Sequence, residues 1–113
     1  MTEMALITHQ ASSGPVLSVI GEFDHESADQ FRTAVHAIEL EPGQLLTVDL
    51  SALAFCDSSG INAILAAHNH TRALGADLAL AYVPPTTARI LRLLGLDHVL
   101  RILPTPETGN GLV

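Results

Sequence analysis

A buried strand gives way to a helix in the segment Val48-Asp49-Leu50-Ser51-Ala52-Leu53-Ala54-Phe55-Cys56-Asp57-Ser58-Ser59-Gly60-Ile61. The almost uninterrupted apolar run over residues 45–50 predicts a central strand that is covered on both faces. A short connection follows, and a helix is expected to begin at residues 57–60. Asp57 is a favourable N-cap, whereas two serines and a glycine are poor helix formers. We infer that a requirement other than helix stability selects them.

Upstream of this segment, the pattern predicts a hairpin and then a helix. Residues 4–9 and 15–20 resemble short strands, and the turn-rich residues 11–14 join them. Asp24 or Ser27 is available as the N-cap of the helix, and Glu41-Pro42-Gly43 is expected to stop it. Its apolar residues recur at helical spacing: Ala28, Phe31, Val35 and Ile38.

Downstream, two more helices and two more strands are expected. The second helix covers residues 58–74 and Gly75 closes it, with Ile61, Ile64, Leu65 and His68 along one side. A strand over 77–83 leads to a third helix that starts at Pro84 and ends with Gly95 as a left-handed cap. A last short strand is expected over residues 99–103, and residues 104–113 are expected to form a flexible tail.

This order of elements indicates the α/β class. The fold expected is a mixed central sheet of about four to five strands, with three or more helices packed on it. A chain of 113 residues is long enough for one ordinary core. We therefore expect a single domain over 1–113, with an ordered core over about residues 4–103.

Charge and composition exclude several classes of function. Twelve acidic residues against five arginines give a net charge of −7, which disfavours nucleic acid or anionic lipid as the main partner. No apolar run approaches the ~20 residues needed to cross a bilayer. Residues 1–4 do not resemble a signal peptide, and the lone Cys56 suits a reducing compartment. A cytoplasmic location is expected.

Ser58 is the residue with the clearest chemical potential. The first turn of a helix presents unpaired N–H groups and the positive end of the helix dipole, so a phosphate there is favoured by about 0.3–1 kcal/mol. Small neighbours also leave Ser58 open to the active site of another protein. For an isolated Asp-Ser-Ser-Gly, however, simple helix capping is the more common explanation.

Four stretches of the sequence occur together in a recognisable order, and the segment 48–61 supplies two of them. They are Gly21-Glu22-Phe23-Asp24, Val48-Asp49-Leu50-Ser51, Phe55-Cys56-Asp57-Ser58-Ser59-Gly60-Ile61 and Leu91-Arg92-Leu93-Leu94-Gly95-Leu96-Asp97. Together they resemble the STAS domain, and most of all the single-domain bacterial anti-sigma factor antagonists. The resemblance extends over about residues 4–103.

The resemblance implies a STAS fold and a partner-switching function. In this family the unphosphorylated form binds an anti-sigma factor, often itself a serine protein kinase, and so frees a sigma factor. The kinase phosphorylates the serine after the aspartate of the motif, which is Ser58 here. Cys56 departs from the larger apolar residue expected at its position, which affects packing more than chemistry. The residues implied in partner binding are Asp24, His25, Asp57, Ser58, Ser59 and Gly60.

The sequence lacks the features that other functions require. An enzyme is not expected, because no Gly-x-Ser-x-Gly elbow is present and no base can be assigned to Ser58. His68 and His70, two residues apart on a helix, point to different faces and do not predict a metal site. Gly109-Asn110-Gly111 lacks the helix that a nucleotide loop requires. We thus expect no catalytic residue, metal or cofactor, and a monomer or weak dimer.

One alternative keeps the same fold and changes the function. STAS domains also occur as subunits of lipid-transport ABC complexes and in stress-signalling scaffolds, and a fold does not determine a function. The complete Asp57-Ser58-Ser59-Gly60 motif favours the antagonist. The neighbouring genes would distinguish the two, since an anti-sigma or sigma gene and a transporter operon give different contexts.

Overall fold

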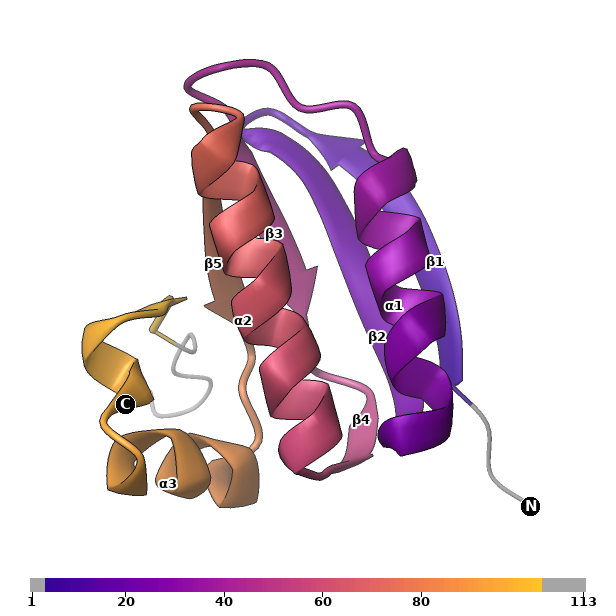
Figure 1. The fold of residues 1–113 in the computed structure, drawn as a ribbon, viewed down its shortest axis with the longest axis vertical. Helices are drawn as coiled ribbons and strands as arrows, with labels where there is room; N and C mark the ends of the chain where they lie inside the picture. Colours follow the sequence, from indigo (N-terminus) through magenta and orange to yellow (C-terminus); the bar gives the residue numbers. More distant parts are fainter. Residues whose placement is uncertain (1–3, 105–113) are drawn as a thin grey trace, which may run out of the picture.

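Leu46, Val48 and Leu50 are fully buried at the centre of the molecule, as the sequence predicts. Leu46 and Val48 belong to a mixed six-stranded sheet, and Leu50 directly follows their strand, in a computed structural model that describes residues 4–104 (Figure 1). The elements, in chain order, are β1 (Met4–Ala11), β2 (Gly14–Phe23), α1 (His25–Ala37), β3 (Leu45–Asp49), β4 (Leu53–Cys56), α2 (Ser58–Ala73), β5 (Asp77–Ala81), α3 (Pro85–Leu93), the 3-10 helix η1 (Leu96–His98) and β6 (Arg101–Ile102).

The strand order in the sheet is β1-β2-β3-β5-β6, and β4 pairs with β2 outside this path. β1 and β2 form the predicted antiparallel hairpin, while the other pairings are parallel. The long strand β2 has two parallel neighbours in succession. Its residues 16–18 pair with β3, and residues 21–23 pair with β4, with a register shift between Gly21 and Glu22. β2 therefore links the central sheet to the segment that precedes α2.

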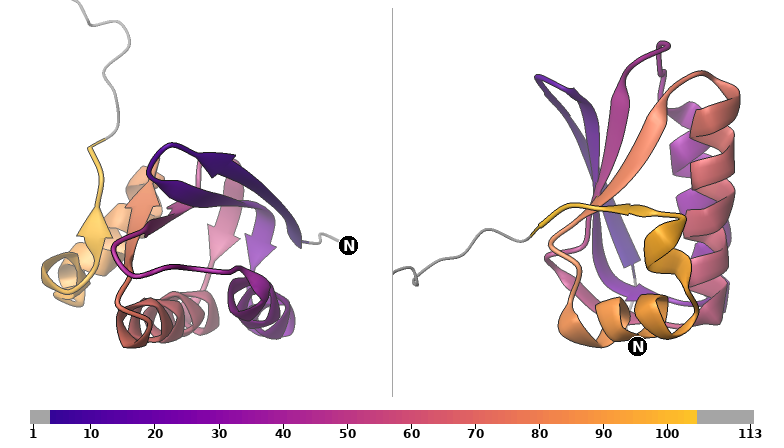
Figure 2. Two further views of the ribbon diagram at one scale, coloured as in Figure 1. Left: turned by 90° about the horizontal axis from the view of Figure 1, so that it is seen from above. Right: turned by 90° about the vertical axis from the view of Figure 1, so that its left-hand side faces the viewer.

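The two long helices α1 and α2 lie side by side on the same face of the sheet (Figure 2). Their apolar sides supply much of the core, where the rings of Phe23 and Phe31 lie 4.7 Å apart between centroids. α3 lies beyond the carboxyl end of β5 (Figure 1). This packing fixes the starts of α1 and α2 at the same end of the sheet.

The expectation that β3 is covered on both faces is wrong. Leu46 and Val48 are fully buried, whereas Leu45, Thr47 and Asp49 are only partly buried. The physical reason is that both long helices cover one face, so that burial alternates along the strand as side chains alternate between faces.

Element boundaries also differ from the predicted ones. The first helix ends at Ala37, before the predicted stop at Pro42 and Gly43, and Ile38 is its extended C-cap. The connection predicted after Leu50 contains the strand β4. The predicted last strand is reduced to Arg101–Ile102, because Val99 and Leu100 form the turn that closes η1, where both donate their N–H groups to the carbonyl oxygen of Leu96.

The second and third helices lie where the sequence places them, and Gly95 has the left-handed conformation with φ of 73°. The predicted tail lies outside the described residues except at Pro104. Among residues 4–104, no helix is long and apolar enough to cross a membrane.

Candidate functional site

Strands β2 and β4 bring two helix starts to neighbouring positions. Phe23 and Cys56, the last residues of these strands, are partners in the parallel ladder. The next residues, Asp24 and Asp57, are the N-caps of α1 and α2. The N–H of Asp57 also donates a hydrogen bond of 3.2 Å to the carbonyl oxygen of Phe23. Two residues that are 33 positions apart therefore lie at the same edge of the sheet.

Asp57 shapes the start of α2 through its side chain. One carboxylate oxygen, Oδ1, accepts hydrogen bonds from the N–H of Ser59 at 2.9 Å and from that of Gly60 at 3.2 Å. Ser58 is the first residue of the helix and is exposed, while Ser59 is half-buried. Capping thus holds the backbone of the motif and leaves the Ser58 side chain at the surface.

Asp24 shapes the start of α1 in a related way, and it settles the choice between Asp24 and Ser27 as cap. Its Oδ1 accepts hydrogen bonds of 3.1 Å from the N–H groups of Glu26 and Ser27. The Ser27 hydroxyl accepts one of 2.9 Å from the N–H of Asp24 and donates another of 2.9 Å to the carbonyl oxygen of Glu22. This is a capping box. Ser27 is buried and its hydroxyl is occupied, in contrast to the exposed Ser58.

Gly60 has a packing role that accounts for its place in the motif. A Cβ atom added there would lie 2.7 Å from the carbonyl oxygen of Phe23 and 2.8 Å from the sulfur of Cys56. Such separations are too short for any larger residue without a shift of the backbone. Gly60 is itself buried, so it acts by letting α2 approach the end of β2. The requirement beyond helix stability that the sequence indicates is, for this residue, close packing.

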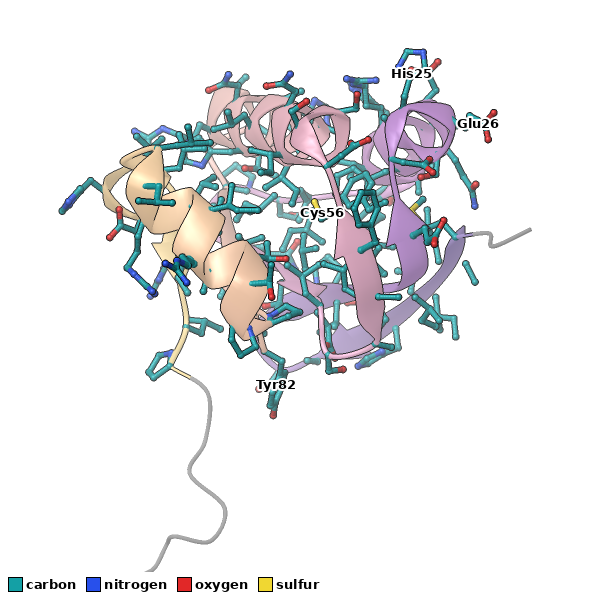
Figure 3. All side chains as sticks on the ribbon, turned by 90° about the horizontal axis from the view of Figure 1, so that it is seen from below. His25, Glu26, Cys56 and Tyr82 are labelled. Carbon is teal, nitrogen blue, oxygen red and sulfur yellow. The ribbon has the colours of Figure 1, made fainter. Side chains whose placement is uncertain are left out.

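Cys56 is a packing residue rather than a reactive thiol. Its side chain points into the interior (Figure 3) and is buried. Burial, and to a smaller extent the neighbouring charge of Asp57, raise the pKa of the thiol to about 12. The thiolate, which is the nucleophile and the metal ligand, is therefore scarce at neutral pH. The small sulfur also fits the narrow space against Gly60, where the sequence analysis expected a larger residue.

His25 lies at the first residue of α1 and points outward (Figure 3). It is exposed, as is Glu26 beside it, whereas Asp24 is half-buried by its capping contacts. The predicted site residues thus divide into three groups. Ser58 and His25 are exposed, Asp24, Asp57 and Ser59 are partly buried, and Gly60 is covered.

An apolar surface that the sequence did not predict lies beside this motif. Phe55, in the unpredicted strand β4, is 51% exposed. A groove runs from β4 to α3 and is lined by Leu53, Ala54, Phe55, Cys56, Pro84, Thr86, Thr87 and Ile90. The apolar tetrapeptide Leu-Ala-Phe-Cys was the available signal, but four residues are too few to distinguish a strand from a connection.

Comparison with known proteins defines the class to which this fold and site belong. Residues 5–109 match the STAS domain family, and the chain belongs to that family. An anti-sigma F factor antagonist of Paenibacillus polymyxa is 30% identical over 88 residues, which cover 77% of this chain and 75% of the relative. An anti-sigma-B factor antagonist of Listeria monocytogenes serovar 1/2a is 25% identical over 93 residues, or 82% of each chain.

Similarity in three dimensions agrees with the family. The crystal structure of an anti-sigma factor antagonist from Mycobacterium paratuberculosis superposes with a TM-score of 0.79 and 26% identity, covering 91% of this chain and 87% of the other. The mixed sheet and helices described above are therefore the STAS fold, as the sequence motifs imply.

Proposed function

We propose that this protein is an anti-sigma factor antagonist controlled by phosphorylation of Ser58. In its unphosphorylated form it binds an anti-sigma factor and releases a sigma factor, and it works in the bacterial cytoplasm. An anti-sigma factor with serine kinase activity transfers the γ-phosphoryl group of ATP to the Ser58 oxygen. The hydroxyl loses its proton, ADP leaves, and the chain acts as substrate rather than enzyme.

The observation that carries this proposal is the exposed hydroxyl of Ser58 at the start of α2. A kinase must reach the acceptor oxygen, and only an exposed side chain allows this without local unfolding. Ser59 is half-buried, and Ser27, at the neighbouring helix start, is buried and hydrogen-bonded. Of the serines at the two helix starts, Ser27, Ser58 and Ser59, Ser58 is thus the exposed one. The names of the relatives supply the class of partner.

The binding surface we propose is built around the two helix starts. Ser58, Asp57 and Asp24 provide its polar centre, with Ser59 and the exposed His25 beside them. Gly60 contributes through packing, since it holds α2 against Phe23. No charged side chain lines the adjoining groove of β4 and α3.

The charge of a phosphate is large enough to switch such a surface. Phosphorylation adds about −1.5 to −2 charges at neutral pH, next to Asp57 and near Asp24. Burying this group against a partner shaped for a hydroxyl costs desolvation and like-charge repulsion. A hundredfold loss of affinity requires only about 2.7 kcal/mol. In the free protein, the dipole of α2 favours the negative charge, so the switch does not need the domain to unfold.

Phosphopeptide mapping tests the choice of serine. Wild type, Ser58→Ala and Ser59→Ala are each incubated with the cognate kinase and ATP, and the modified residue is located by mass spectrometry. We expect phosphate on Ser58 in the wild type and in Ser59→Ala, and none in Ser58→Ala. Phosphate that persists in Ser58→Ala and vanishes in Ser59→Ala would show that Ser59 is the acceptor.

A further inference from the structure

The helices α1 and α2 bring two imidazole rings into contact at the end opposite to Ser58. The rings of His36 and His70 lie 4.1 Å apart between centroids, with an interplanar angle of 41°. His36 is exposed and His70 is half-buried, so solvent reaches the pair. His70 lies 12 residues after Ser58 on α2, or about 18 Å along the helix axis. The pair is therefore separate from the proposed partner-binding surface.

We propose that His36 and His70 form a binding site for a divalent transition-metal ion such as Zn²⁺, Ni²⁺ or Cu²⁺. Imidazole nitrogen is a preferred ligand of these ions. Two ligands at a tetrahedral zinc, each about 2.0–2.1 Å from the ion, lie roughly 3.3 Å apart. Rings whose centroids lie 4.1 Å apart must separate and turn their nitrogens toward one point to reach this arrangement, which requires changes in χ1 as well as χ2. The exposed His36 side chain is free to make these changes.

The dipoles of the two helices favour a cation here, while the exposed Arg72 in the last turn of α2 opposes one. His36 and His70 lie in the last turns of their helices, where unpaired carbonyl groups carry the negative end of the helix dipole. The net charge of the chain, −7, acts in the same direction.

The site would be an open one. Among residues 4–104, no three or more histidine, cysteine, aspartate or glutamate side chains gather as a metal site. Two imidazoles would hold the ion, and water would fill its other positions. His68 takes no part, because it is buried on a different side of α2. His68 and His70 thus lie on different sides of α2, as their spacing predicts, and the partner of His70 comes from the neighbouring helix.

Calorimetric titration of tag-free protein with NiCl₂ tests this site. We expect one ion per chain, and at least a tenfold loss of affinity, about 1.4 kcal/mol, in both His36→Asn and His70→Asn. The matched control is His98→Asn, which removes an exposed histidine elsewhere and should bind like wild type. The affinity order should be Cu²⁺ above Ni²⁺ and Zn²⁺, with no competition from Mg²⁺, which prefers oxygen ligands.

Nuclear magnetic resonance gives a second readout that does not depend on variants. Substoichiometric Ni²⁺ is paramagnetic and should broaden the ring signals of His36 and His70 before those of the other four histidines. Equal broadening of all six, binding that survives in both single variants, or no saturable binding would overturn the proposal. None of these results bears on the phosphorylation of Ser58.

Discussion

The N–H of Asp57 donates a hydrogen bond of 3.2 Å to the carbonyl oxygen of Phe23, and this contact joins the two halves of the candidate site. Phe23 ends β2, and the residue after it caps α1, while Asp57 itself caps α2. The carboxyl ends of two paired strands thereby set two helix starts side by side. Ser58 is exposed at this edge on a rigid framework, which a docking surface requires.

Replacing Gly60 with alanine should destabilise the protein. In an ordinary helix this change stabilises by roughly 0.5–1 kcal/mol. Here the new methyl group would meet the Phe23 carbonyl oxygen and the Cys56 sulfur at 2.7 and 2.8 Å, and such overpacking costs about 1–3 kcal/mol. Urea unfolding of wild type and Gly60→Ala measures the effect. Exposed Asn62→Ala on the same helix is the control, and a Gly60→Ala variant as stable as wild type would contradict this packing.

Asp57 should contribute to stability through capping and not through its charge. Asp57→Ala removes both bonds to the backbone of α2 and should lower the free energy of unfolding by about 0.5–2 kcal/mol. Asp57→Asn keeps an acceptor oxygen, so its stability should be close to that of wild type. Chemical denaturation of wild type, Asp57→Ala and Asp57→Asn tests this prediction. Equal losses of unfolding free energy in both variants would show that Asp57 stabilises the protein through its charge.

The sequence predicts the elements whose patterns are local. The helix start at Asp57, the burial of Val48 and the left-handed Gly95 each follow from a few neighbouring residues, and the structure confirms them. The edge formed by Asp24 and Asp57 was implied only through family resemblance. No periodicity in the sequence predicts that β2 pairs with β3 over residues 16–18 and with β4 over residues 21–23.

What the sequence could not supply depends on contacts between distant segments. The need for glycine at position 60 arises from Phe23, 37 residues earlier. The contact of His36 with His70 depends on how α1 and α2 are placed on the sheet. β3 was expected to be covered on both faces because an apolar run in the sequence does not indicate which face of the sheet the helices occupy.

The native Cys56 thiol should react slowly with alkylating reagents. Its pKa is raised to about 12, first by burial and then by Asp57, so little thiolate exists at mildly alkaline pH and the sulfur is shielded. Urea-unfolded protein should react far faster, with a pKa near the usual ~8.5. Alkylation by iodoacetamide, followed by mass spectrometry, compares the two states, and similar rates would show that Cys56 is accessible in the folded protein.

The stability of the protein should fall in mild acid through His70. Burial and His36 lower the pKa of His70 below its ordinary value of 6.5, so the unfolded chain takes up this proton first. The contribution of neutral His70 to the free energy of unfolding is fully present above pH 6.5 and is lost as the pH falls through that value. The loss stops below the lowered pKa of His70 in the folded state. Urea unfolding between about pH 8 and pH 5 should show a smaller decrease in His70→Asn than in wild type. An identical pH dependence in the two proteins would contradict this assignment.

The central claim is that a negative charge at Ser58 abolishes partner binding while the fold persists. Titration of the cognate anti-sigma factor with wild type, phosphorylated wild type, Ser58→Ala and Ser58→Asp tests it most directly, with a thermal melt of each protein as the control. We expect Ser58→Ala to bind like unmodified wild type. The phosphorylated protein and Ser58→Asp should melt close to wild type and bind about a hundredfold more weakly, equivalent to about 2.7 kcal/mol. Undiminished binding by the phosphorylated protein, or loss of binding only because Ser58→Asp is unfolded, would contradict the account.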